Sequence, residues 1–248
     1  VRAGNWSSAL RRKIPTMMII MLLFLSGNVA AQRLVPDKDS AGELGKILVQ
    51  DQKGRTKPLI TLSNDILRKV ARENRFEGLT PMQVFVGIYL DFDRWKNVPL
   101  IRIGGTDLQR RLGIKGNMAS FSDLVDLDGG GFYKLGEDVE KIYSKPPGAR
   151  TKTDKEILKA DERINIIYLI YTGGFLKIFP PHDGSHDWNT PEEAYKHTAN
   201  REDSLYLRNV IPLLSESVRE GNGHRISQIA GSLSQYQRNF AGYELPSE

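Results

Sequence analysis

Residues 152–172 read K-T-D-K-E-I-L-K-A-D-E-R-I-N-I-I-Y-L-I-Y-T, and this stretch determines the fold class expected for the chain. Its large apolar residues recur at the three- and four-residue spacing of a helix. They are Ile157, Ile164, Ile167, Tyr168, Leu169, Ile170 and Tyr171. The pattern predicts one long central helix that presents a broad apolar face to the core.

Working outward, several further segments begin with the residues that favour helix starts. Ser40 to Glu43, Thr80 to Gln83 and Thr190 to Glu193 each fit a capping box, and the last two have proline at the first helical position. The predicted helices are 40–48, 62–73, 81–94, 106–112, 120–126, 135–144, 152–172, 190–198, 202–220 and 223–241. Short apolar runs predict strands at 46–50, 100–103 and 175–179. We expect a mainly α, irregular helical domain with a few short strands.

The first 31 residues have the features of an export signal. Arg11, Arg12 and Lys13 precede a short apolar run from Met17 to Leu25, and small residues stand before Gln32. The strongly apolar run is shorter than the roughly 20 residues that span a bilayer, although milder flanks extend it. We predict a signal peptide or the end of a membrane helix at 1–31, followed by an extracytoplasmic domain at 32–248. A subdomain break near 145–150 is the alternative to a single domain.

Composition excludes several functions for this chain. The net charge of +5 derives mostly from the first 31 residues, which contain four basic and no acidic residues. The remainder is nearly neutral, which gives no support to a nucleic-acid partner. The chain has no cysteine, so it has no thiol nucleophile, thiolate metal site or C-x-x-C-H haem attachment motif of its own.

Residues 49–69, V-Q-D-Q-K-G-R-T-K-P-L-I-T-L-S-N-D-I-L-R-K, predict a turn at Gly54 that presents a basic pair, followed by an amphipathic helix capped by Thr61 or Ser63. This stretch resembles a segment of the cytochrome c biogenesis proteins of the ResB/CcsA type (system II), in the fused form typical of Bacteroidetes-like bacteria. Further blocks resemble the same family in the same order over roughly residues 38 to 245: W-K-N-V-P-L-I at 95–101, A-S-F-S-D at 119–123, D-E-R-I-N at 161–165 and F-L-K-I-F-P at 175–180.

The resemblance implies a function for the complete protein. Members of this family move haem across the inner membrane and join its vinyl groups to the thiols of an apocytochrome, which makes the full-length family resemble a haem lyase. The tryptophan-rich haem-handling motif and the membrane histidines of the family are missing here. We therefore expect a scaffold or docking surface on the periplasmic side of the inner membrane, with no catalysis of its own. The implied cofactor is haem, and the implied partners are apocytochrome c, a haem-handling membrane domain and a periplasmic thiol reductant.

Two groups of residues are candidate sites. Arg55 and Lys57 could clamp an anion such as a haem propionate, because arginine offers a planar fork and lysine a point charge. Their alternative role is that of two solvated charges on a turn. His182 and His186 are four residues apart and have carboxylates nearby, so they could hold a divalent metal. They lie in a proline-flanked loop, however, and an ordinary polar loop is the alternative.

Two rival functions follow from the same residues. A free periplasmic enzyme, a metal-assisted hydrolase, would use His182 and His186 as ligands. A plain envelope ligand-binding module would need neither a metal nor haem. Metal content after purification and titration with haemin distinguish these possibilities from the scaffold.

Overall fold

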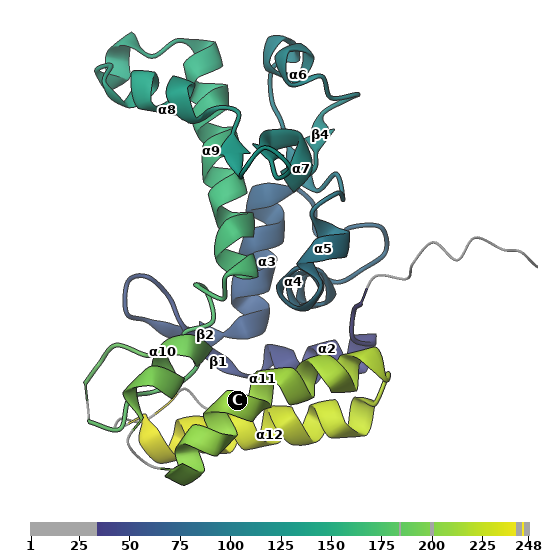
Figure 1. Cartoon of the computed structure of the whole chain (residues 1–248), viewed down its shortest axis with the longest axis vertical. Coiled ribbons are helices and arrows are strands. Elements are labelled where there is room, and N and C mark those ends of the chain that lie inside the picture. Colours follow the sequence, from purple (N-terminus) through teal and green to yellow (C-terminus); the bar gives the residue numbers. More distant parts are fainter. Residues whose placement is uncertain (1–33, 184, 199–200, 242–244, 246–248) are drawn as a thin grey trace, which may run out of the picture. The chain divides into compact units, whose positions relative to one another are not determined.

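The structure is a computed structural model, and it describes residues 34–183, 185–198, 201–241 and 245. The expected signal peptide or membrane segment at 1–31 lies outside these residues. Within them the fold is mainly helical, as the sequence predicts (Figure 1). The α-helices are α2 (Lys38–Gly45), α3 (Leu59–Val70), α4 (Pro81–Leu90), α5 (Phe92–Trp95), α6 (Thr106–Leu112), α7 (Phe121–Leu124), α8 (Gly136–Tyr143), α9 (Lys152–Tyr171), α10 (Pro191–His197), α11 (Arg201–Arg219) and α12 (Gly223–Phe240).

The strands in the described residues form three small antiparallel pairs. They are β1 (Leu48–Gln50) with β2 (Thr56–Pro58), β3 (Ile101–Arg102) with β4 (Met118–Ala119), and β5 (Val125–Asp126) with β6 (Phe132–Tyr133). The expected strand at 175–179 is wrong. Local hydrogen bonds turn this segment, including Leu176 N–H to Gly173 O, and only Phe179 forms an isolated bridge, to Asn189.

Capping explains where several helices begin. The capping boxes of Thr80 with Gln83 and Thr190 with Glu193 are confirmed, and Thr151 with Asp154 adds one at the start of α9. The box predicted at Ser40 is wrong, because the Asp37 carboxylate accepts from the Asp39 and Ser40 N–H groups and starts α2 earlier.

Two other predicted helix boundaries also change. Helix α3 begins at Leu59 without a side-chain cap, and the Ser63 hydroxyl donates to Ile60 O, so capping by Thr61 or Ser63 is wrong. The single helix expected at 81–94 is two helices, α4 and α5. Asp91 separates them with non-helical dihedral angles (φ −143°, ψ 50°).

Helix α9 occupies the central position that its sequence predicts. It packs against α3, α4, α8 and β3 and buries Ile157, Ile164, Ile167 and Ile170 (Figure 1). Its two tyrosines differ from the expected core face, because Tyr168 and Tyr171 are 52% and 45% exposed. The isoleucines of this 20-residue helix therefore lie in the core, whereas its two tyrosines are partly exposed at the surface.

The subdomain break near 145–150, which is the alternative to a single domain, would fall in a short 3₁₀ turn, η1 (Pro147–Ala149). Buried apolar side chains on both sides of this turn, Ile142 and Ile157 among them, belong to the same hydrophobic cluster. Whether the chain divides there into separate folding units stays a prediction.

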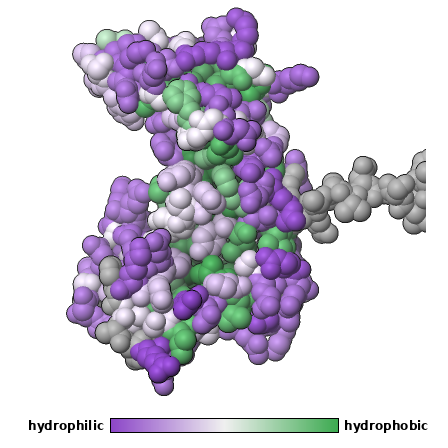
Figure 2. All heavy atoms as spheres, viewed as in Figure 1, coloured by the Kyte–Doolittle hydropathy of each residue, from purple (hydrophilic) through white to green (hydrophobic). Residues whose placement is uncertain are grey.

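No helix in the described residues combines the length and the apolar character needed to cross a bilayer. On the face shown in Figure 2, hydrophilic residues cover most of the surface, and hydrophobic residues appear in smaller groups between them.

Candidate functional site

The β1–β2 hairpin carries the first candidate site, and its turn is built around Asp51. The Asp51 carboxylate accepts hydrogen bonds from the Lys53 and Arg55 N–H groups at 2.8 and 3.1 Å, while Gly54 N–H donates to Asp51 O. Gly54 takes a φ of +78°, which a side chain would disfavour. The turn predicted at Gly54 is therefore present.

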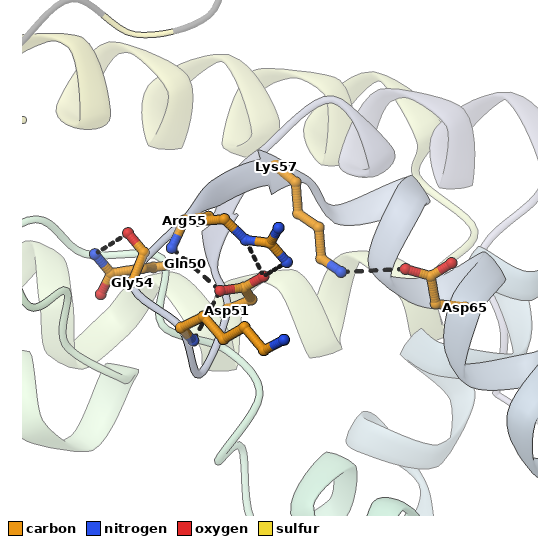
Figure 3. A network of polar contacts seen from close by, with 7 residues as sticks. Gln50, Asp51, Gly54, Arg55, Lys57 and Asp65 are labelled. Carbon is orange, nitrogen blue, oxygen red and sulfur yellow. Dashed lines mark hydrogen bonds and ion pairs between the residues drawn. The ribbon is translucent and has the colours of Figure 1, made fainter.

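Arg55 and Lys57 both have carboxylate partners (Figure 3). The Arg55 guanidinium donates to Asp51 from Nε and Nη2, at 3.3 and 3.0 Å, and Lys57 Nζ lies 3.2 Å from Asp65 Oδ2. The two basic groups are thus directed to different carboxylates. An anion bound here would have to compete with Asp51 and Asp65, and the predicted anion clamp stays a prediction.

Gln50 connects this hairpin to the histidine loop, although the two segments are far apart in sequence. Its buried amide donates from Nε2 to His186 O at 2.7 Å and to Gly54 O at 3.3 Å. Its Oε1 accepts from Trp188 N–H at 2.8 Å. The two candidate sites are therefore neighbours in the folded chain.

A second buried amide fixes the same region from α12. Gln237 Oε1 accepts from Leu48 N–H at 3.0 Å, and Nε2 donates to Leu48 O and Ile178 O at 2.7 and 2.8 Å. Leu48 is the first residue of the short strand β1. Ile178 lies in the segment 175–179, where the predicted strand is absent. Gln237 thus supplies the hydrogen bonds that a longer sheet would otherwise supply.

His182 is held on both ring nitrogens. Its Nε2 lies 2.7 Å from the Tyr236 hydroxyl, its Nδ1 lies 3.5 Å from Asp203 Oδ2, and its ring stacks on Phe240 with centroids 3.9 Å apart. A metal at His182 would have to displace one of these neighbours. For His186 the structure shows a backbone contact, the hydrogen bond from Gln50 to its carbonyl oxygen.

The described residues contain no group of three or more histidine, aspartate or glutamate side chains placed to share a metal ion. The proposed metal role of His182 and His186 would therefore need a further ligand. Metal binding by these two histidines stays a prediction, and the positions of their described neighbours do not add support to it.

A cavity of about 470 Å³ opens beside His182. Its lining includes Pro180, Asp183, Asn189 and Leu207, together with His182 and Tyr236. Burial raises the pKa of Tyr236, and the negative charge of Asp203 raises it further, so the phenol stays protonated as a hydrogen-bond donor. His182 and Tyr236 can orient a polar ligand in this cavity by hydrogen bonding.

Sequence reasoning found His182 but missed the residues that position it. Asp203 lies on α11 and Tyr236 on α12, and the apolar spacing of α12 indicates only that Tyr236 is a core residue. The sequence does not indicate that Gln50 and Gln237 are buried, because nothing in the sequence distinguishes a buried glutamine from an exposed one. Only the arrangement of the helices brings these residues together.

The described residues form a mainly helical module in which two buried amides bond to the short strand β1, the histidine loop and the segment around Ile178. A comparison with protein-family models finds no match. The chain is similar to the protein NrfI of Wolinella succinogenes, with 33% identity over 207 residues. These residues make up 82% of this chain and 22% of NrfI, so the chain corresponds to about a fifth of its relative. The similarity is that of a distant homologue of one part of NrfI.

Proposed function

We propose that this chain is an extracytoplasmic part of a cytochrome c maturation protein and acts as a scaffold or docking surface. The observation that carries the proposal is the 33% identity to NrfI over 82% of the chain. NrfI is a cytochrome c biogenesis protein of the ResB/CcsA type, the family that the sequence blocks at 49–69, 95–101, 119–123, 161–165 and 175–180 resemble.

The proposed role is one of positioning. Thioether formation needs haem and two thiols held together in a reactive orientation, and a rigid body that holds a partner lowers the entropic cost of that arrangement. The chain has no cysteine, so both thiols would come from the apocytochrome. The proposed partners are apocytochrome c, a haem-handling membrane domain and a periplasmic thiol reductant.

The proposed location is the outer side of the inner membrane. The basic and apolar pattern at 1–31 supports export or tethering, and the relation to NrfI supports a place in the cell envelope. Haem would be handled by the complete protein, and the described residues would shape or recruit its substrates.

The test is an in-frame deletion, in the organism's own gene, of the codons for residues 34–248. Covalently bound haem is then measured by peroxidase activity on denaturing gels, with non-covalent haem as the internal control. We expect covalent haem to be lost and non-covalent haem to remain. Unchanged levels of c-type cytochrome would contradict the proposal.

A second measurement separates docking from catalysis. The purified 248-residue chain is mixed with reduced haem and an apocytochrome that carries C-x-x-C-H. We expect binding of the apocytochrome without formation of a thioether. Thioether formation by this chain alone would show that the scaffold role is wrong.

A further inference from the structure

A second cavity, of about 400 Å³, opens beside α9. It opens between α9 and the segments that carry α5, α7 and the β5–β6 hairpin. Its lining is mostly aromatic or aliphatic: Phe92, Phe121, Val125, Leu127, Tyr133, Ile164, Tyr168 and Tyr171, with Gly131 and Asn165. The volume falls in the range of small-molecule sites, about 300 to 1,000 Å³.

The aromatic walls of this cavity are held in place by one another. Phe92 stacks on Tyr171 with centroids 3.9 Å apart and meets Phe121 edge to face at 5.0 Å. The outer part of the wall is open, because Tyr168, Tyr171 and Leu127 are 52%, 45% and 39% exposed. Ordered aromatic rings that remain accessible to solvent are suited to bind a ligand across their faces.

A carboxylate lies beside this aromatic wall. Asp161, Asn165 and Tyr168 follow one another at positions i, i+4 and i+7 of α9, so they share one face of the helix. No ion pair between described residues involves Asp161, whereas its neighbour Glu162 pairs with Lys69 at 2.7 Å. The site therefore offers a negative charge without a basic partner of its own.

Tyr133 joins the carboxylate to the cavity. Its ring lines the cavity, and its buried hydroxyl interacts with the Asp161 carboxylate and has no other hydrogen-bond partner among the described residues. Burial raises the pKa of Tyr133, and the Asp161 charge raises it further. Burial also raises the pKa of Asp161, so a cation placed beside this carboxylate would relieve the cost of its charge.

We propose that this cavity binds a small organic cation with an apolar body, such as an arylalkyl ammonium. The ammonium group lies at the side of the cavity that Tyr133 lines, near the Asp161 carboxylate, and the apolar body lies against Tyr168 and Tyr171. Charge-assisted hydrogen bonding to a carboxylate and attraction of the cation to aromatic faces supply the selectivity.

The test uses the whole chain and three phenyl probes. The probes are 2-phenylethylammonium, the neutral 2-phenylethanol and the anionic 3-phenylpropanoate, each titrated and followed by NMR. We expect saturable binding of the cation and at least about tenfold weaker binding of the alcohol and the anion. This comparison needs no substitution, so it stands even if a variant fails to fold.

Variants then locate the site. Asp161→Asn and Tyr168→Ala should each weaken binding of 2-phenylethylammonium by about tenfold. The matched controls are Glu162→Gln, which is next to Asp161 but paired with Lys69, and Tyr195→Ala, an exposed tyrosine on α10. Both controls should bind as the unsubstituted chain does, and thermal unfolding checks that each variant is folded.

Three results would overturn the proposal. The first is no saturation by the cation below about 10 mM. The second is equal binding of the cation and the alcohol, which would describe a merely apolar cavity. The third is unchanged binding in a folded Asp161→Asn variant.

Discussion

At the scale of single residues, two glutamine side chains supply backbone hydrogen bonds that neighbouring strands would supply in a longer sheet. Gln50 and Gln237 are 3% and 2% exposed, and both bond to backbone groups of segments distant in sequence. The amide carries donors and an acceptor on one side chain, so it can satisfy several backbone groups at once. The hairpin with Arg55 and Lys57 is fixed to the histidine loop in this way.

The Gln237→Leu substitution tests this role. Leucine has a similar size but leaves the backbone groups of Leu48 and Ile178 without their partner, and we expect a loss of about 2 to 4 kcal/mol in the free energy of unfolding. This loss in the free energy of unfolding is measured by urea denaturation. The control is Gln235→Leu on the same helix, where the side chain is exposed and bonds only to the exposed side chains of Asn239 and Arg238 among the described residues. Equal effects of the two substitutions would contradict the assignment.

Two aspartates on α9 should give pH effects of opposite sign. Hydrogen bonding from Thr151 N–H, and then Lys145, lowers the pKa of Asp154, whereas burial raises that of Asp161. Asp154 therefore stabilises the fold above its unfolded pKa and loses this contribution as the pH falls through its lowered folded pKa. Ionisation of Asp161 opposes folding at neutral pH, and acidification relieves this cost.

The measurement is the free energy of unfolding of wild type minus that of the asparagine variant, followed from pH 7 to about pH 3. We expect this difference to decrease on acidification for Asp154→Asn and to increase for Asp161→Asn. Changes of the same sign in both variants would show that the two carboxylates do not differ as the structure indicates.

At the scale of elements, helix starts are set by local chemistry wherever a side chain can reach the first N–H groups. Thr151 N-caps α9, and its hydroxyl accepts from Asp154 N–H at 3.1 Å. Thr151→Ala should lower the free energy of unfolding by about 1 kcal/mol. Thr153→Ala, at an exposed position within the same helix, should cause no loss, since alanine is the better helix former. Thermal unfolding compares the two, and an equal loss in both would contradict the cap.

Helix α11 contains a proline in its interior, Pro212, which is exposed. Proline cannot donate the backbone hydrogen bond expected at this position, so Pro212→Ala should raise the free energy of unfolding by about 1 to 2 kcal/mol. Pro191→Ala, at the first turn of α10, is the control and should give no such gain, because proline is tolerated there. Denaturation in urea measures both, and a loss for Pro212→Ala would show that this proline is favourable where it stands.

At the scale of the whole molecule, the question is whether the chain unfolds as one unit across residues 145–150. Trp95 lies before this point and Trp188 after it, and both are buried, at 4% and 1% exposure. In variants that lack Trp6 and keep only one of these two tryptophans, we expect fluorescence and far-UV circular dichroism to report the same urea midpoint. A fluorescence midpoint that departs from the dichroism in either variant would indicate two folding units.

Much of the fold follows from local patterns. The spacing of isoleucines in α9 and the boxes at Thr80 and Thr190 predict helices that the structure contains, with ends close to those expected. The errors lie where local rules compete. Asp37 caps α2 in place of Ser40, and the apolar segment at 175–179 turns instead of pairing as a strand. A short apolar run does not specify its hydrogen-bond partners.

The candidate site was predictable only in part. His182 stands out in the sequence because histidine is rare here, but its partners Asp203 and Tyr236 come from separate helices. Similarly, Tyr168 and Tyr171 resemble core residues in a helical pattern, and their exposure beside Asp161 depends on which elements cover α9. The spacing of side chains in the sequence predicts which residues share one face of a helix. Tertiary packing decides whether that face is buried by other elements or exposed to solvent.

The sequence by itself determined the mainly helical class, most helix starts and the similarity to part of NrfI, because helical spacing and capping act within a few residues and identity is a property of the sequence. Only the tertiary structure decided that the basic hairpin lies against the histidine loop, that His182 is held by Tyr236 and Asp203, and that an aromatic cavity beside Asp161 remains open. These contacts join segments far apart in the chain, and no local rule specifies which distant residues become neighbours.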